Sequence, residues 1–259
     1  MRFLRPRRFN PPLREERWLR DGRPVALPFG ATTLAAWMWG ESGPTVLLAH
    51  GWEGRGSQMG GLGRWLSQEG FRAIAFDHPG HGKSPGRSSS LPEMADALLA
   101  AAFRFGPVSA VVAHSAGCAA TTYALRRGLL AERLVYVSPP ADLGYFAFQF
   151  GDMVGLSRPV AQRMRQRIET RLGITWPEIH GLDVAASCER PLLVIHDHDD
   201  REVGIDHGRE LAQAWPGARF MATARRGHRR ILRAPEVWTA TAQFLVAGGT
   251  TVPLALEAS

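Results

Sequence analysis

A serine lies between very small residues in the stretch 113–117, which reads Ala-His-Ser-Ala-Gly. The run 109–113 that leads into it is short and apolar, as in a buried strand, and the run 118–127 that follows it favours a helix. A tight strand-to-helix turn needs residues without bulk at both second neighbours of its central residue. The pattern predicts that Ser115 is a nucleophile on such a turn, although small residues flank many serines by chance.

An acid and a histidine follow two later strand-like runs. Asp200 comes four residues after the apolar run 191–196, and His228 comes shortly after the run 218–223. A serine hydroxyl is nearly inert at neutral pH, so it needs a base such as imidazole, and a carboxylate must orient the imidazolium that forms. Because ligands of parallel sheets bind at the carboxyl ends of the strands, we expect both side chains to lie beside Ser115.

The carbonyl that a serine attacks becomes an oxyanion, which preorganised N–H donors stabilise. The backbone N–H of Ala116 lies at the start of the helix predicted after the serine. The backbone N–H of Trp52 follows His50 and Gly51, at the end of the apolar run 45–49. We expect these two groups to form an oxyanion hole, and we expect His50 to bond the backbone beneath the loop.

Each assignment has a structural alternative. Ser115 could be an ordinary small residue in a turn, and His228 an exposed histidine among arginines. Asp200 could cap the helix that follows, in which case Asp199 would take the catalytic position. Asp77 is expected to fix a turn and to do no chemistry.

A metal-dependent hydrolase is a second hypothesis. The run His196-x-His198-x-Asp200 resembles the start of the metallo-β-lactamase ligand run, and two histidines so spaced can hold zinc. In that run a histidine directly follows the aspartate, whereas Arg201 stands here, and the run normally lies early in the chain. We therefore expect no metal and no other cofactor.

Strand-like and helix-like runs alternate along the chain. This alternation implies right-handed crossovers and a mostly parallel sheet covered on both faces, in which the first two strands are antiparallel. The predicted strands are residues 24–29, 32–39, 45–49, 71–76, 109–113, 133–137, 191–196 and 218–223, and the predicted helices are residues 57–68, 92–105, 118–127, 203–214 and 234–246.

The segment from about residue 140 to residue 187 is too long for a simple crossover. It holds an aromatic run at 145–150 and a basic helix at 158–171, and we interpret it as a lid over the carboxyl edge of the sheet. Aromatic side chains pack in cores more often than they line pockets, but an acyl pocket remains an interpretation here. The candidates for its lining are Phe146, Phe148, Phe150 and also His114, which either shapes the site or simply packs.

Composition fits one α/β domain with an insertion, because 45% of the 259 residues are hydrophobic and 21% are charged. Neither a membrane span nor a secretory signal is visible, and two cysteines, Cys118 and Cys188, suit a reducing compartment, so we expect a cytoplasmic protein. The net charge of +7 comes mostly from arginine. Without a recognised nucleic-acid motif, we interpret it as a solvated surface and expect no nucleic-acid partner.

Taken together, these motifs resemble the α/β-hydrolase fold superfamily, particularly its serine esterases and lipase-like members. The resemblance spans roughly residues 32–246, and it implies an eight-stranded, mostly parallel sheet, a cap between the sixth and seventh strands, and a Ser115–Asp200–His228 triad. Ala113 and Asp197 depart from it, since glycine is usual at both positions. The matching residues are His50-Gly51-Trp52, the run 77–84 (Asp-x-Pro-Gly-His-Gly-x-Ser), the run 113–117, Asp200-x-x-Val203 with His196 before it, and Gly227-His228.

We expect residues 1–31 to be an N-terminal extension with the first strand region, residues 32–139 and 188–248 the hydrolase core, 140–187 the cap, and 249–259 a tail. The expected function is hydrolysis of a small acyl substrate, a carboxylic ester, through an acyl-enzyme. A thioester, an amide or a carbon–carbon bond would suit the same triad, and a non-catalytic binding module would keep the fold alone. No feature of the sequence indicates an oligomeric state.

Overall fold

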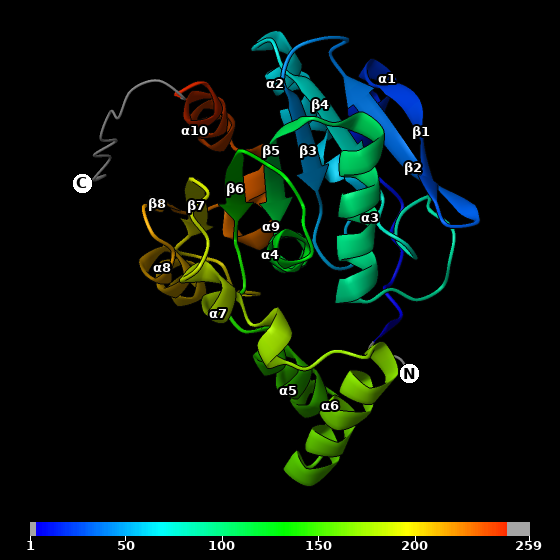
Figure 1. Ribbon diagram of the computed structural model, residues 1–259, viewed down its shortest axis with the longest axis vertical. Coiled ribbons are helices and arrows are strands. Elements are labelled where there is room, and N and C mark those ends of the chain that lie inside the picture. The colour runs from blue at the N-terminus through cyan, green and yellow to red at the C-terminus, as the bar shows by residue number, and fades with distance from the viewer. Residues whose placement is uncertain (1–3, 248–259) are drawn as a thin grey trace.

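The computed structural model describes residues 4–247, and within that range eight strands form one sheet in the order β1-β2-β4-β3-β5-β6-β7-β8 (Figure 1). The β1–β2 and β2–β4 pairs are antiparallel and the later pairs are parallel, so the predicted sheet is confirmed. The predicted tail 249–259 lies outside the described residues. The strands are β1 (Arg23–Phe29), β2 (Thr32–Trp39), β3 (Thr45–Ala49), β4 (Arg72–Phe76), β5 (Val108–His114), β6 (Arg133–Val137), β7 (Leu192–Asp197) and β8 (Arg219–Thr223).

Helices cover both faces of the sheet because its central strands are apolar at almost every position. Neighbouring residues of a strand face opposite sides. In β3, Leu47 and Ala49 belong to the buried cluster that includes side chains of α3, α4 and α8, whereas Val46 and Leu48 belong to the cluster that includes side chains of α2 and α10. These covering helices are α2 (Gly60–Gln68), α3 (Leu91–Phe105), α4 (Ala116–Arg126), α8 (Ile205–Ala214) and α10 (Pro235–Val246).

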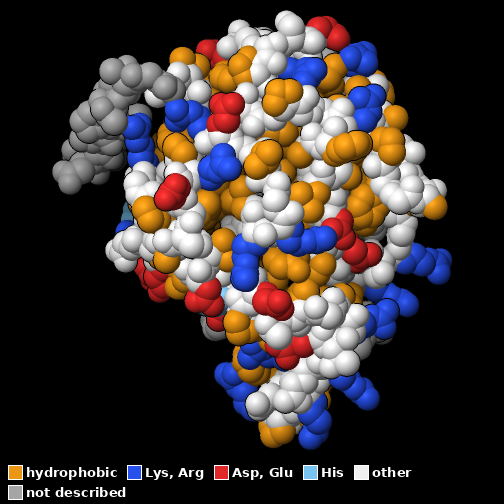
Figure 2. Space-filling model, in the orientation of Figure 1, with side chains coloured by type: hydrophobic (Ala, Val, Ile, Leu, Met, Phe, Trp, Pro, Cys, Tyr) orange, Lys and Arg blue, Asp and Glu red, His pale blue; other side chains and the backbone are white. Residues whose placement is uncertain are grey.

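Between β6 and β7 the chain forms α5 (Leu143–Met153), α6 (Arg158–Leu172), a short 3₁₀ turn and α7 (Gly181–Ala185). In Figure 1, α5 and α6 stand apart from the sheet and its covering helices, at one end of the molecule. The guanidinium of Arg165 on α6 lies over the rings of Phe148, at 4.5 Å, and Trp176, at 4.9 Å, and so joins the pieces of this segment. Figure 2 shows Lys and Arg side chains gathered around this end.

The sequence predicts only strands and turns between residues 14 and 43, but helix α1 (Leu13–Asp21) occupies the start of that stretch. Its carboxylate Glu15 is buried, and it accepts hydrogen bonds from Arg55 Nε and Ser57 Oγ, each at 2.7 Å. Those donors come from a loop some forty residues away. A local pattern cannot reveal that a charged residue will be buried by so distant a partner.

None of the helices within residues 4–247 is both long enough and apolar enough to cross a lipid bilayer.

Candidate active site

Ser115 lies on a strained turn between β5 and α4. Its φ of +52° falls in a region that residues other than glycine seldom adopt, and such a conformation costs about 1–3 kcal/mol. The surrounding backbone holds it there, because Ser115 N donates to Val137 O at 2.9 Å and Ser115 O accepts from Cys118 N at 2.8 Å. Because Ser115 directly follows the last residue of β5, it lies at the carboxyl edge of the sheet, and it is only partly buried there.

The small residues around Ser115 allow three pieces of chain to meet. A Cβ on Gly117 would lie 2.6 Å from His50 O and 2.7 Å from Ala49 O, so the start of α4 fits against β3 only without a side chain. On the other side, a Cβ on Gly51 would lie 2.8 Å from Ser115 Cβ. The loop that follows β3 therefore passes directly against the serine.

His228 and Asp200 form a buried pair at the same edge. His228 Nδ1 donates to Asp200 Oδ2 at 2.8 Å. The other carboxylate oxygen, Oδ1, accepts the backbone N–H groups of Glu202 and Val203, each at 2.9 Å. Asp200 thus caps the turn after β7 and orients the imidazole at once. Asp199, the alternative acid, is exposed and accepts Arg225 N.

Asp200 stays ionised in this setting. Burial by itself raises the pKa of a carboxyl group, but hydrogen bonds from His196 and His228 outweigh burial and hold the pKa of Asp200 below its usual range. His196 Nε2 lies 3.5 Å from Asp200 Oδ2 and 2.9 Å from Val203 O. A negatively charged carboxylate therefore already lies beside His228, where it would stabilise an imidazolium.

His114 connects the serine strand to the histidine loop. It directly precedes Ser115, and its ring centroid lies 4.6 Å from that of His228. Its Nε2 lies 2.8 Å from His228 O and donates to that carbonyl. Burial lowers the pKa of His114 to about 3, so it is a neutral donor near pH 7. His228 is thereby fixed against His114, the residue that precedes Ser115.

Asp197 holds the loop that carries His228, a role that the sequence does not predict. Its Oδ1 accepts Gly227 N at 2.9 Å, and its Oδ2 accepts Arg226 N at 3.1 Å and Thr223 Oγ1 at 2.7 Å. Burial raises the pKa of this carboxyl, but these donors outweigh burial and leave it lowered. Glycine is usual at position 197 in the family that the sequence resembles. The aspartate found there instead is the sequence feature that could have indicated this role.

The loop after β3 is fixed from below by His50. His50 Nδ1 lies 2.7 Å from Gly51 O and donates to it, and His50 Nε2 accepts His78 N at 3.0 Å. Burial keeps the pKa of His50 well below its ordinary value, so the ring stays neutral. Asp77 holds the neighbouring loop, because its carboxylate accepts Gly56 N at 2.6 Å and Lys83 N at 2.7 Å.

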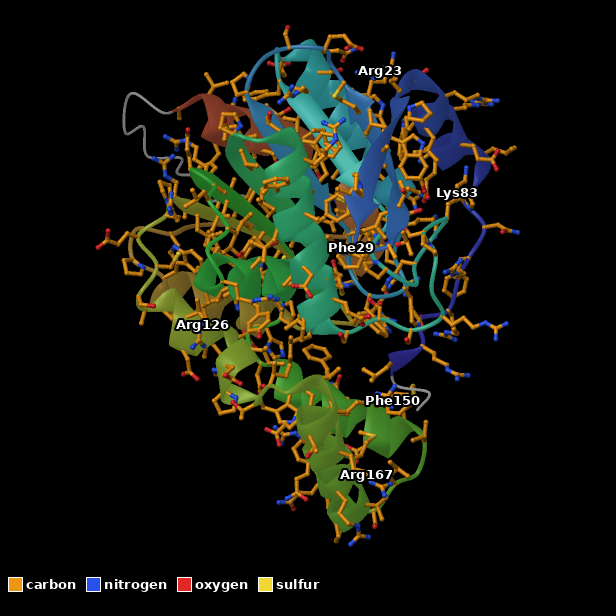
Figure 3. All side chains as sticks on the ribbon, turned by 45° about the vertical axis from the view of Figure 1, so that its right-hand side comes forward. Arg23, Phe29, Lys83, Arg126, Phe150 and Arg167 are labelled. Atoms are coloured by element: carbon orange, nitrogen blue, oxygen red, sulfur yellow. The ribbon has the colours of Figure 1, made fainter. Side chains whose placement is uncertain are left out.

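A cavity of about 760 Å³ opens above Ser115. The core supplies Ser115, Ala116 and Trp52 to its wall, and the helices α5 and α6 supply mainly apolar side chains. In Figure 3, Phe150 lies on the part of the segment 140–187 nearest the sheet and its covering helices, whereas Arg167 lies farther out. The residues of the segment 140–187 that line the cavity include Phe146, Phe150, Met153, Ile168, Leu172 and Trp176.

Two residues proposed from sequence for the pocket are not among its lining residues. Phe148 lies on α5 between Phe146 and Phe150, but a shift of two residues turns a helical side chain to the opposite face. Phe148 accordingly packs beneath the guanidinium of Arg165. His114 lies under His228 and contributes no surface to the cavity.

The sequence gives no indication that the N-terminal arm, residues 4–8, belongs to the site. Leu4, Arg5 and Arg7 line the cavity. Arg7 Nε and Nη2 donate to both carboxylate oxygens of Glu53, each at 3.0 Å, directly after Trp52. The contacts join positions 46 residues apart, so no local pattern could have predicted them.

The run His196-x-His198-x-Asp200 does not form a metal centre of three ligands. His196 Nε2 is bonded to Val203 O, and His198 is exposed. Across residues 4–247, no group of three or more His, Cys, Asp or Glu side chains is arranged to hold a metal ion.

A model of the alpha/beta hydrolase family matches residues 46–242. Among solved structures, an esterase of Pyrococcus furiosus shares 20% identity at a TM-score of 0.67, covering 93% of this chain and 96% of its own. A putative lipase of Acinetobacter baumannii shares 19% identity at a TM-score of 0.71, covering 90% and 93%. A putative non-heme bromoperoxidase of Mycobacterium tuberculosis shares 20% identity at a TM-score of 0.66, covering 84% and 97%. A comparison with curated proteins gave no match. At 19–20% identity, these similarities to solved structures establish the fold alone.

Proposed function

Because the chain belongs to the alpha/beta hydrolase family, we propose that it is a serine hydrolase that cleaves carboxylic esters through an acyl-enzyme. One observation carries the proposal. The buried His228–Asp200 pair, joined at 2.8 Å, lies against His114, the residue next to a serine held at a φ of +52°. Strain of this kind is common where a side chain must be presented for reaction.

In the proposed mechanism, Ser115 Oγ attacks the ester carbonyl as His228 Nε2 takes its proton. Asp200 keeps the opposite ring nitrogen protonated and stabilises the imidazolium. The oxyanion accepts hydrogen bonds from the backbone N–H groups of Ala116 and Trp52. His228 then gives its proton to the departing alcohol. Water attacks the acyl-enzyme in the same way, releasing the carboxylic acid and returning the proton to Ser115.

The apolar wall of the cavity supports an ester with a hydrocarbon acyl chain as substrate. Phe146, Phe150 and Ile168 would bury such a chain, and burial of apolar surface contributes about 25 cal/mol per Å². In this proposal the segment 140–187 is a cap that sets which acyl groups fit. Thioesters, amides and carbon–carbon bonds suit the same triad and form part of the test.

We predict that the purified protein hydrolyses p-nitrophenyl esters and that Ser115→Ala removes this activity while circular dichroism stays unchanged. Loss of the nucleophile from a triad lowers kcat by about 10⁶. Parallel assays with matched thioester and anilide substrates define the leaving group, and activity should be indifferent to EDTA. A Ser115→Ala variant with wild-type turnover would falsify the proposal.

A further inference from the structure

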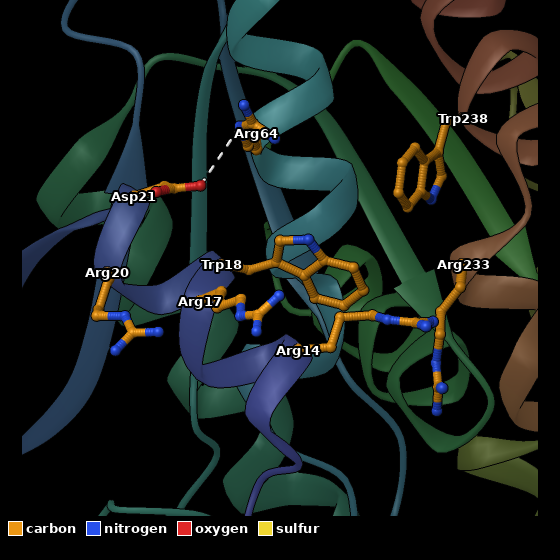
Figure 4. A pocket seen from close by; sticks show the side chains of 8 residues that line it. All are labelled: Arg14, Arg17, Trp18, Arg20, Asp21, Arg64, Arg233 and Trp238. Atoms are coloured by element: carbon orange, nitrogen blue, oxygen red, sulfur yellow. Dashed lines mark ion pairs between the residues drawn. The ribbon is translucent and has the colours of Figure 1, made fainter.

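A second hollow, of about 630 Å³, lies among α1, α2, α10 and the turn that precedes α10 (Figure 4). In the described part of the chain it shares no lining residue with the cavity above Ser115. We call it the arginine pocket, and its lining residues are Arg14, Arg17, Trp18, Arg20, Asp21, Arg64, Arg233 and Trp238.

The positive charge of the arginine pocket is mostly unpaired. Arg64 Nε lies 3.4 Å from Asp21 Oδ2, and this ion pair is the one that residues 4–247 provide there. Arg14, Arg17 and Arg20 follow one another at three-residue spacing on α1, where like charges repel and destabilise the helix. The three guanidinium groups repel one another, and a bound anion would relieve that repulsion.

Two tryptophan rings form a fixed floor between these arginines. Trp18 and Trp238 meet edge to face with centroids 6.3 Å apart, and Trp238 Nε1 donates to Leu232 O at 2.8 Å. A Cβ on Gly61 would lie 2.8 Å from the Trp238 ring and 2.9 Å from the Trp18 ring, so α2 packs closely beneath both. Figure 4 shows Trp18 in the middle of the hollow, between Arg17 and Arg233.

We propose that the arginine pocket binds an anion that carries two phosphate groups. A guanidinium presents a planar fork of donors that matches phosphate oxygens in pairs. Each phosphate monoester carries about 1.5 to 2 negative charges at pH 7, so two of them match the four arginines that lack a carboxylate partner in residues 4–247. Two sources present this chemistry, a soluble anion and a lipid headgroup, and the experiment below distinguishes them.

The test is calorimetric titration of the protein with inorganic pyrophosphate at low salt. We expect saturable binding at one site, weakened about tenfold or more in Arg14→Gln/Arg17→Gln/Arg233→Gln, since hydrogen bonds to charged groups are strong. The control, Arg163→Gln/Arg167→Gln/Arg171→Gln, removes the same charge from exposed positions on α6 and should shift affinity less than twofold. Thermal unfolding verifies that both variants fold.

A second arm of the experiment uses vesicles with and without a phosphatidylinositol bisphosphate, whose headgroup carries two phosphate monoesters. Pocket-dependent binding to the acidic vesicles, without binding of pyrophosphate, would assign the anion to a lipid headgroup and still support the site. Equal losses in the two triple variants would mean that net charge alone attracts anions, and the inference would fail. It would fail equally if the wild-type protein bound neither pyrophosphate nor acidic vesicles.

A different set of contacts carries a second inference, which rests on the proposed function. Besides the Arg7–Glu53 pair, Arg8 donates to the carbonyls of Gly80, Ser84 and Gly86, and Leu4 O accepts Ser89 N at 2.9 Å. The N-terminal arm is thus tied down at Leu4 and at Arg7 and Arg8 after it. Leu4 is apolar, is 7% exposed and lines the cavity. We infer that Leu4 helps to determine which acyl chains bind.

Leu4→Ala tests this role through the ratio of kcat/KM for octanoate and acetate esters. Loss of an apolar contact to the longer chain should lower the ratio about tenfold, and the exposed Leu13→Ala should leave it unchanged. An unaltered ratio in an active Leu4→Ala enzyme would refute the inference and leave the proposed hydrolase standing. If the wild-type protein hydrolyses no ester, the proposed function itself has failed.

Discussion

Three carboxylates at the end of β7 differ in what faces them, and this difference separates their roles. Asp200 receives the imidazole of His228, Asp197 receives the backbone of the loop that carries that histidine, and Asp199 is exposed with Arg225 N as its donor. Sequence alone leaves Asp199 and Asp200 open as the acid. The proposed catalytic acid is the carboxylate that contacts the imidazole of His228, and His228 lies 28 residues after Asp200 in the chain. A local sequence pattern does not reveal that contact.

At the residue scale, we predict that Asp200→Asn lowers kcat by about 10⁴, because an amide can neither stabilise the imidazolium nor hold the required tautomer. Asp199→Asn keeps an oxygen that can accept Arg225 N, so its kcat should stay within about threefold of wild type, as expected for an exposed substitution. Steady-state kinetics on one p-nitrophenyl ester measures both variants. The reverse order of effects would assign the acid to Asp199.

At the scale of elements, close backbone approach fixes the site. The strand-to-helix turn works because Gly117 lets α4 begin against the carbonyls that end β3, and Gly51 brings the next loop against Ser115. The same elements explain what could be predicted. The strands of the sheet follow from apolar runs and their ends shift by only a residue or two, whereas α1 and the N-terminal arm are held by partners far away in sequence.

Gly117→Ala should destabilise the protein by about 1–3 kcal/mol and reduce ester turnover, because the added methyl meets His50 O and forces α4 away from β3. Gly204→Ala is the matched control. Its Cβ meets nothing within 4 Å and its φ is −60°, but it is the N-cap of α8, where alanine is less favourable than glycine, so we expect a loss of no more than about 0.5 kcal/mol. Urea unfolding gives both free energies. Similar values for the two variants would contradict this explanation of the turn.

At the scale of the whole molecule, the described core contains several neutral histidines. His50, His78, His81 and His114 are all buried, and burial lowers the pKa of each, to about 4 for His81 and about 3 for His114. An unfolded chain protonates its histidines near pH 6.5. Between that pH and the lowered pKa values, the unfolded state therefore binds more protons than the folded state.

The free energy of unfolding should consequently fall as the pH is lowered from 7 to 5. His81 and His114 each account for about 2 kcal/mol of this loss, because both folded pKa values lie below pH 5 and the unfolded chain gains protons over about 1.5 pH units above it, at about 1.36 kcal/mol per unit. Burial raises the pKa of Asp77, which acts in the opposite direction but through a single group. Urea unfolding at constant ionic strength measures the change, and a free energy that is equal or higher at pH 5 would contradict it.

If His228 activates Ser115, the serine reacts with a fluorophosphonate, and covalent labelling measures that reaction. Intact-mass spectrometry followed by peptide mapping should find one adduct, on Ser115, in the wild-type protein and none in Ser115→Ala. Labelling of His228→Ala should be slower by about 10³ or more, because the serine then lacks its base. An adduct on a different residue, or equal labelling rates with and without the imidazole, would contradict the account.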